Sequence, residues 1–179
     1  DPTVIPAIGA HKLFQIDIRL PEGATHNVVV TDTLNGSGIS YVLENDAAFD
    51  IAYTFEGIAT INGAAPGETA MTAFPTDETA DSAVWNIGTV TTLSEDDASV
   101  NAVNPLIRIT YYARINNDAV TDAGDTLQNS VAVAYNHGET AATETLTATT
   151  AAVAVVEPSI GLGKTVTNIT NFGTPLQAG

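Results

Sequence analysis

The sequence contains no cysteine among its 179 residues. Disulfide bonds therefore cannot stabilise the fold, and metal sites built from thiolates are excluded. Exported prokaryotic surface proteins commonly lack disulfides, and so do cytosolic proteins, so the compartment has to be inferred from other features.

Basic residues are also scarce. Five Lys and Arg residues stand against 21 Asp and Glu residues, which gives a formal net charge of −16 and an isoelectric point near 4.1. Nucleic acids and anionic membrane surfaces are disfavoured as partners, because they would repel such a chain. The excess of acid also repels itself at low salt, so high ionic strength or bound divalent cations would stabilise the protein.

Long apolar runs and helical periodicity are missing. No segment approaches the roughly 18 consecutive apolar residues of a membrane-spanning helix, and the first residues do not form a signal peptide. Any export signal or anchor is therefore expected outside this chain. Hydrophobic residues still make up 44% of the sequence, mostly Ala, Val and Ile among Thr and Gly, which predicts a folded β protein.

Alternation of apolar and polar residues with a period of two is the pattern that the sequence does show. It is clearest in Leu106–Ile115, where Ile107, Ile109 and Tyr111 fall on one face and Arg108 on the other. Such alternation is typical of a strand with one buried face. We expect this strand to be central, with Ile109 and Tyr111 in the core.

Further strand-like segments are separated by turn signals such as Pro21-Glu22-Gly23 and His137-Gly138. They are Phe14–Leu20, Asn27–Leu34, Ile39–Leu43, Phe49–Phe55, Val84–Leu93, Leu127–Tyr135 and Thr143–Val156. Many short strands without amphipathic helices predict an all-β, antiparallel β-sandwich.

A domain boundary is expected at Glu157-Pro158, because proline interrupts strand pairing and a new strand-like segment follows it. Residues 1–157 would form one sandwich module. Residues 158–179 are too few for a core of their own, so they are interpreted as a linker and the first strand of a following module, or as a donated strand. That strand carries Ile160, Leu162, Lys164 and Val166 at alternate positions.

Several of these segments, in this order, resemble the DUF11-type conserved repeat and the isopeptide-forming fimbrial domain of large prokaryotic surface proteins. The resemblance covers roughly residues 5–45 and 84–170 and rests on Gly9–Val42, Ile109–Asn116, Leu127–Tyr135 and the junction Val155–Asn168. It implies an immunoglobulin-like sandwich on the cell surface, in an extracellular array in which each module contacts mainly its neighbours.

The resemblance also implies a covalent cross-link. In the related fimbrial domains a neutral lysine amine attacks an asparagine carboxamide, while a nearby carboxylic acid shuttles protons. Asn129 matches the position of that asparagine. The matching lysine of this module would lie before Asp1, and Lys164 is the equivalent lysine of the following module. A candidate isopeptide bond therefore joins Asn129 to Lys164 of a neighbouring copy.

Acidic residues crowd the loop between Leu106–Ile115 and Leu127–Tyr135. Carboxylate, amide and backbone oxygens from such a loop can supply the roughly six to eight ligands that calcium takes. The candidate calcium ligands are Asn116, Asp118, Asp122 and Asp125. The loop is not an EF-hand, and solvated acids of a salt-adapted surface remain the alternative. Second choices are Asp77, Glu78, Asp81 and Glu95–Asp97.

Catalytic motifs are not evident in the sequence. His11, His26 and His137 have neither the spacing of zinc ligands nor a nucleophile motif beside them. We therefore expect a protein that is not an enzyme.

A carbohydrate-binding module is the alternative from another functional class. It would need an exposed platform of aromatic side chains. Aromatic residues make up only 6% of the sequence, and we expect Phe14, Tyr111 and Tyr135 to be used in the core.

The sequence thus predicts a structural or adhesive module of a large secreted cell-surface or fibre-forming protein, stabilised by calcium in one version of the hypothesis. Its expected partners are neighbouring modules or copies of itself, joined head to tail by strand donation, and a cell-surface or glycan ligand is a further candidate.

Overall fold

The computed structural model describes residues 7–35, 38–42, 49–72, 82–93, 105–117, 123–137 and 142–156. The strands in these ranges are β1 (His11–Arg19), β2 (Ala24–Asn35), β3 (Ile39–Val42), β4 (Ala52–Glu56), β5 (Ile58–Ile61), β6 (Ser82–Thr92), β7 (Leu106–Ile115), β8 (Thr126–His137), β9 (Thr143–Thr149) and β10 (Val153–Ala154). A 3-10 helix, η1, spans Glu68–Ala70. No helix in these ranges has the length and apolar character needed to cross a membrane.

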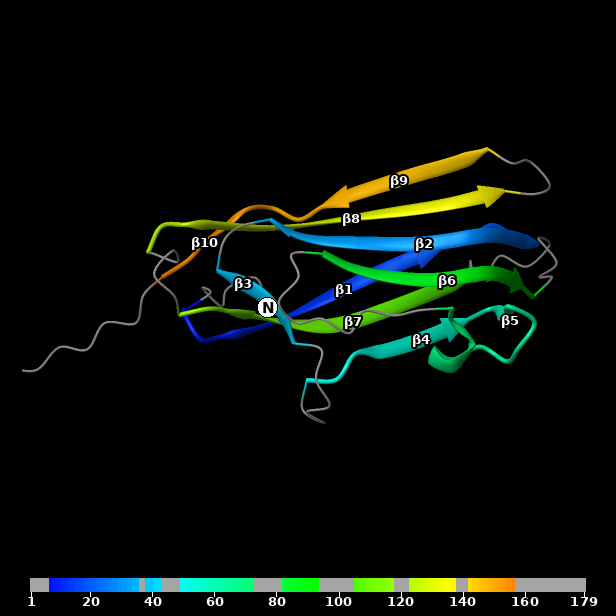
Figure 1. The fold of residues 1–179 in the computed structure, drawn as a ribbon, viewed down its shortest axis with the longest axis horizontal. Helices are drawn as coiled ribbons and strands as arrows, with labels where there is room; N and C mark the ends of the chain where they lie inside the picture. The colour runs from blue at the N-terminus through cyan, green and yellow to red at the C-terminus, as the bar shows by residue number, and fades with distance from the viewer. Residues whose placement is uncertain are drawn as a thin grey trace, which may run out of the picture.

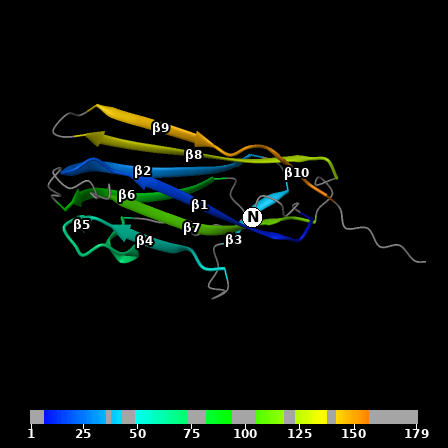
Figure 2. The ribbon, with the colours of Figure 1, turned by 180° about the vertical axis from the view of Figure 1, so that it is seen from behind.

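The strands form two sheets that face each other (Figures 1 and 2). The four-stranded sheet has the order β1-β7-β3, and β4 also pairs with β7. The six-stranded sheet has the order β10-β8-β2-β6-β5, and β9 also pairs with β8. Every pairing between these strands is antiparallel. The prediction of an all-β, antiparallel, immunoglobulin-like sandwich is confirmed.

Strand β7 lies in the middle of the four-stranded sheet, between β1 on one side and β3 and β4 on the other. Its inward row is fully buried: Ile107, Ile109, Tyr111, Ala113 and Ile115 are each 0% exposed. The alternation in the sequence therefore predicted both the strand and its buried face correctly. β1 pairs with β7 in unbroken register, from His11 opposite Arg114 to Arg19 opposite Leu106.

Aromatic side chains connect the two sheets through the core. Trp85 of β6 is fully buried, and its ring centre lies 5.8 Å from that of Tyr111. The indole Nε1 donates a hydrogen bond to the Tyr53 hydroxyl at 3.1 Å, which satisfies the polar edge of the buried ring.

A glycine shapes the end of the six-stranded sheet. Gly88 has φ +91°, and a Cβ there would lie 2.3 Å from Asn62 Oδ1. Only glycine therefore allows the Asn62 amide to approach. That amide accepts a hydrogen bond from Thr89 N at 2.8 Å and donates to Ala70 O at 2.8 Å and Ile87 O at 2.9 Å. These contacts join the loop after β5 to β6.

The segment Thr143–Val156 is not the single strand that the sequence suggested. It forms β9 and β10, which pair with successive stretches of β8. Thr150 separates them: its hydroxyl accepts a hydrogen bond from Asn129 N at 3.0 Å, and its own N–H donates to Asn129 O at 2.8 Å. Beyond the break, Val155 is 1% exposed and donates to Asp125 O.

Candidate functional site

The outer edge of β1 borders an open groove, which we call the β1 slot. Among the described residues β1 pairs only with β7, so its other edge carries backbone groups without a strand partner. The slot encloses about 180 Å³. Its wall includes Ile16 and Ile18 of β1 and Leu20, which follows that strand. Its floor includes Val131 and Val133 of β8 and Leu146 of β9.

The floor of the slot is apolar and incompletely covered. Val131, Val133 and Tyr135 pack against the core but are only partly buried, and Leu146 is 62% exposed. An extended strand beside β1 would cover these side chains and pair with the open edge. The slot therefore fits a strand with apolar residues at alternate positions.

Asn129 lies next to the slot in the inward row of β8. The row consists of alternate residues of the strand: Leu127, Asn129, Val131, Val133 and Tyr135. Asn129 is the polar member of the row and is 6% exposed. A strand that follows β8 along the slot would therefore pass over a buried carboxamide.

A buried polar cluster surrounds this carboxamide and consists of Asp32 of β2, Tyr41 of β3, Tyr111 of β7 and Asn129 of β8. Asn129 Nδ2 donates to the Tyr111 hydroxyl at 2.6 Å. Tyr111 and Tyr41 both donate to Asp32 Oδ2, at 2.5 and 2.9 Å. The cluster thus connects an acid and an amide from one sheet through hydroxyls of the other.

Two oxygens of the cluster have no hydrogen-bond donor. Asp32 Oδ1 and Asn129 Oδ1 each expose less than 1 Å² and accept no bond from the protein. Buried acceptors are satisfied in most folded proteins, so each such atom needs an explanation. A primary amine carries several N–H groups and is the kind of donor that two neighbouring acceptors could share.

The surroundings of Asp32 shift its equilibrium toward the protonated form. Burial raises the pKa of Asp32, although hydrogen bonds from Tyr111, Tyr41 and Asn129 oppose this rise. Burial and the nearby acid also raise the pKa values of Tyr41 and Tyr111, so both remain hydrogen-bond donors. A carboxyl group that holds its proton beside an amide can donate that proton to the amide oxygen.

The candidate calcium ligands are only partly described. Asn116 Oδ1 accepts a hydrogen bond from Ser40 Oγ at 3.0 Å, and Asp125 lies in the turn before β8. Asp118 and Asp122 lie outside the described residues, as do the second-choice acids. Within the described part of the chain, no three His, Cys, Asp or Glu side chains are grouped as metal ligands. Calcium binding therefore stays a prediction.

The proposed donor strand also lies outside the described residues. This applies to Ile160, Leu162, Lys164 and Val166, and to the expected boundary at residue 158. The structure thus describes the acceptor side of the predicted contact, including Asn129. The sequence identified Asn129 but not Asp32 and Tyr41 of the same cluster, which come from distant strands and share no motif with it.

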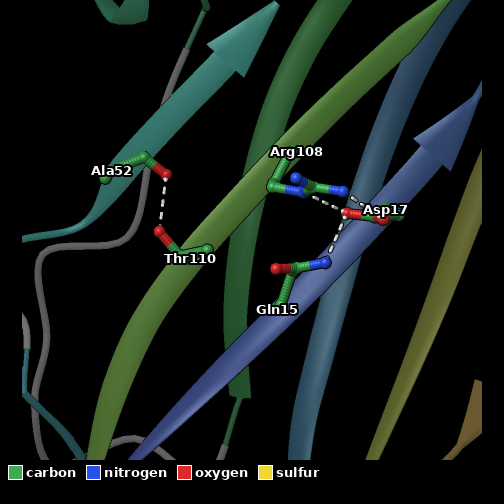
Figure 3. A network of polar contacts seen from close by, with 5 residues as sticks. All are labelled: Gln15, Asp17, Ala52, Arg108 and Thr110. Atoms are coloured by element: carbon green, nitrogen blue, oxygen red, sulfur yellow. Dashed lines mark hydrogen bonds and ion pairs between the residues drawn. The ribbon is translucent and has the colours of Figure 1, made fainter.

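Side-chain contacts on the outer face of the four-stranded sheet link β1 to β7 (Figure 3). Arg108 donates to both carboxylate oxygens of Asp17, through Nε at 2.7 Å and a terminal nitrogen at 2.8 Å, and Gln15 donates to the same carboxylate. The Arg108 hydrogen bond lowers the pKa of Asp17. Thr110 donates to Ala52 O and so connects β7 to β4.

The rings of His11, Phe49 and Tyr112 meet on this face. His11 stacks on Phe49 with centres 4.2 Å apart and planes 18° apart, whereas Phe49 meets Tyr112 edge-on at 81°. The rings therefore pack against one another and do not form a coplanar platform for a sugar.

No family model and no curated protein matches this chain. Among solved structures, it is similar to a variant of BcpA, the major pilin subunit of Bacillus cereus, with a TM-score of 0.52 and 12% identity. That match covers 86% of this chain and 36% of the other. A 35 kDa C-terminal fragment of the major pilin GBS80 of Streptococcus agalactiae also matches, with a TM-score of 0.45, 12% identity, and coverage of 84% and 51%.

The likeness to the BcpA variant concerns the fold alone. The chain has a pilin-like β-sandwich and spans about a third to a half of the pilin chains that it matches. Because no family model matches, membership of the DUF11-type family stays a prediction.

Proposed function

We propose that this chain is a structural module of an extracellular cell-surface fibre, joined end to end to copies of itself or to neighbouring modules. The observation that carries the proposal is the β1 slot, an open strand edge above an apolar floor. The likeness to a major pilin subunit supports it at the level of the fold. The module's role is to provide length and stiffness, and catalysis has no part in it.

The occupant of the slot is the strand Ile160–Val166 of a neighbour. Pairing with β1 satisfies its open edge, and alternate side chains bury the exposed floor. Because the donor segment and the slot are different surfaces, each copy can both donate and accept a strand. Such a heterologous contact repeats into a filament unless it closes into a ring.

The donor strand and the acceptor strand β8 carry the same order of side-chain types at alternate positions. In each row, two apolar residues are followed by a polar residue and then by another apolar residue. The acceptor row along β8 is Val133, Val131, Asn129 and Leu127, and the donor row is Ile160, Leu162, Lys164 and Val166. With the donor antiparallel to β8, Lys164 falls at Asn129, where two buried acceptor oxygens have no donor.

A covalent step follows from this placement. Burial lowers the pKa of a lysine amine, so Lys164 reaches the site neutral and its Nζ attacks Asn129 Cγ. Asp32 gives its proton to the amide oxygen, takes a proton from the attacking nitrogen and passes it to the departing nitrogen. When the carbonyl re-forms, the proton on its oxygen returns to Asp32. One C–N bond forms, one breaks, and ammonia leaves, so no oxidant or reductant is needed.

The covalent step is tested by mass spectrometry of the concentrated full chain under denaturing conditions. The expected product has the mass of two chains less one ammonia. Asn129→Ala, Asp32→Asn and Lys164→Ala should each abolish it, whereas Lys12→Ala should retain it. If the wild-type chain gives no covalent product, the covalent step is wrong, and strand donation without a bond has to be judged separately.

Strand donation is tested by adding a synthetic peptide, Ser159–Asn168, to a chain that ends at Glu157. Calorimetry should show saturable binding at one peptide per chain. A peptide with Leu162→Asp, or an acceptor chain with Val131→Lys, should bind much more weakly, because each places an unpaired charge in the slot. Equal heats from all pairs would refute donation into the slot.

A further inference from the structure

Strand β9 forms a second open edge, on the six-stranded sheet. It pairs with β8 in continuous register, from Thr143 opposite Asn136 to Thr149 opposite Ser130. Among the described residues no strand pairs with its other edge, and every residue of β9 is exposed. Figure 1 shows β9 at the margin of the sandwich.

The edge of β9 lacks the features that usually protect such edges. Proteins block exposed strand edges with lysine, proline, bulges or very short strands. β9 has seven residues, no lysine, no proline and no register shift. Its charged residue, Glu144, accepts a hydrogen bond from the Tyr135 hydroxyl at 2.8 Å. Leu146, in the middle of the strand, is 62% exposed.

We propose that β9 pairs with β9 of a second copy, antiparallel across a two-fold axis, so that two sandwiches join side by side. This contact would pair the open backbone edge of β9, whereas a donated strand would pair with the edge of β1. Leu146 also lines the floor of the β1 slot, so the two contacts share this side chain. The pairing of β9 goes beyond the proposed end-to-end assembly, because it joins copies side by side.

The low charge along this margin favours a second copy as the occupant of this edge. Two chains that each carry −16 repel at most surfaces. Beside β9, however, the strands β8, β2 and β6 contain one acidic residue and no lysine or arginine, and that acid, Asp32, is buried in the core. Two copies can therefore approach along this margin with little like-charge repulsion.

The pairing register follows from the side chains. Centring the two-fold axis on Leu146 brings the two exposed leucines together on the inward face and places Thr145 opposite Thr147 on the outer face. Glu144 then lies opposite Ala148. The two Glu144 side chains are four residues apart along the strands, about 13 Å at the usual rise, which exceeds the screening length of about 8 Å in physiological salt.

The absence of cysteine gives a direct test of this register. In the full chain with Leu162→Asp, which disfavours strand donation, Leu146→Cys should form a disulfide-linked dimer under mild oxidation, because paired residues have Cα atoms within disulfide range. Thr143→Cys is the matched control: its partner is Thr149, so it should give no dimer. If both variants cross-link equally, or neither does, the register is refuted.

A charge exchange tests the contact without cross-linking. In the same background, Thr145→Lys with Thr147→Lys puts lysine opposite lysine and should abolish the dimer in sedimentation equilibrium. Thr145→Glu with Thr147→Lys puts opposite charges together and should retain it. The variant with two lysines is the less acidic of the two chains. If only overall charge repulsion mattered, this variant would therefore dimerise more strongly than the variant with Glu and Lys. Equal masses for the two variants, with unchanged melting temperatures, would overturn the proposal.

Discussion

The hydroxyl of Tyr111, on β7, donates a hydrogen bond to Oδ2 of Asp32, on β2, and so links the two sheets inside the core. Tyr41 donates to the same oxygen, and Asn129 donates to Tyr111. A connected network of this kind favours one arrangement of the sheets, because a shift of either sheet would leave several buried groups without partners. The same network holds the reactive groups of the proposed cross-link.

Core packing under β7 gives the first prediction. Ile109→Ala and Tyr111→Ala should each lower the free energy of unfolding by about 2–5 kcal/mol, because each leaves a cavity in the core. Arg114→Ala, at an exposed position of the same strand, should change it by less than about 0.5 kcal/mol. Urea denaturation measures all three, and equal losses at the inward and outward positions would mean that the buried face is assigned wrongly.

The buried acid gives a prediction about pH. Burial raises the pKa of Asp32 in the folded state above its ordinary 3.8, so the stability from its neutral form is complete below about pH 4 and is lost as pH rises through the folded pKa. Asp32→Asn stays neutral throughout. Relative to this variant, the free energy of unfolding of the wild type should therefore fall as pH rises above about 4.

Asp17 provides a control, because its pKa is shifted in the opposite direction and its effect on stability should change with pH in the opposite sense. Its pKa is lowered in the folded state by the Arg108 hydrogen bond, so its contribution is present above its unfolded pKa and is lost as pH falls through the folded one. Asp17→Asn should therefore lose stability relative to the wild type at neutral pH and not in acid. Identical pH profiles for the wild type and Asp32→Asn would contradict the account of the buried acid.

Calcium stabilisation is a separate prediction. A ligand that binds only the folded state raises the melting temperature. Adding calcium to metal-free protein should therefore raise its melting temperature, and replacing Asp118, Asp122 and Asp125 with Asn should remove most of that shift. Magnesium at equal ionic strength is the control for charge screening. A melting temperature that excess chelator leaves unchanged would rule out a stabilising calcium site.

The strands with one fully apolar face were predictable because burial imposes a period of two on the sequence. Ile107, Ile109 and Tyr111 alternate with Arg108 and Thr110, so both the strand and its face could be inferred. The segment Leu127–Tyr135 was predicted as a strand in the same way. Strand β5 was missed because its buried residues do not alternate: Ile58 and Ile61 are three positions apart, with a register shift between Ile58 and Thr60.

The candidate site was only partly predictable. Asn129 could be found from the resemblance. Its hydrogen bond to Tyr111 could not, because it joins side chains of two strands across the sandwich. Asp32 is buried, but nothing in the sequence distinguishes it from an ordinary polar strand residue. The break at Thr150 was also hidden, because threonine is favoured in strands and the break depends on its hydrogen bonds to Asn129.

End-to-end assembly through the β1 slot is the central claim, and sedimentation velocity of the concentrated full chain tests it most directly. The full chain should form species that grow with concentration, whereas the full chain with Ile160→Asp and Leu162→Asp should not grow beyond the pair joined through β9. Val131→Lys, which alters only the acceptor, should have the same effect. If all three chains sediment alike at every concentration, the slot does not join one copy to the next.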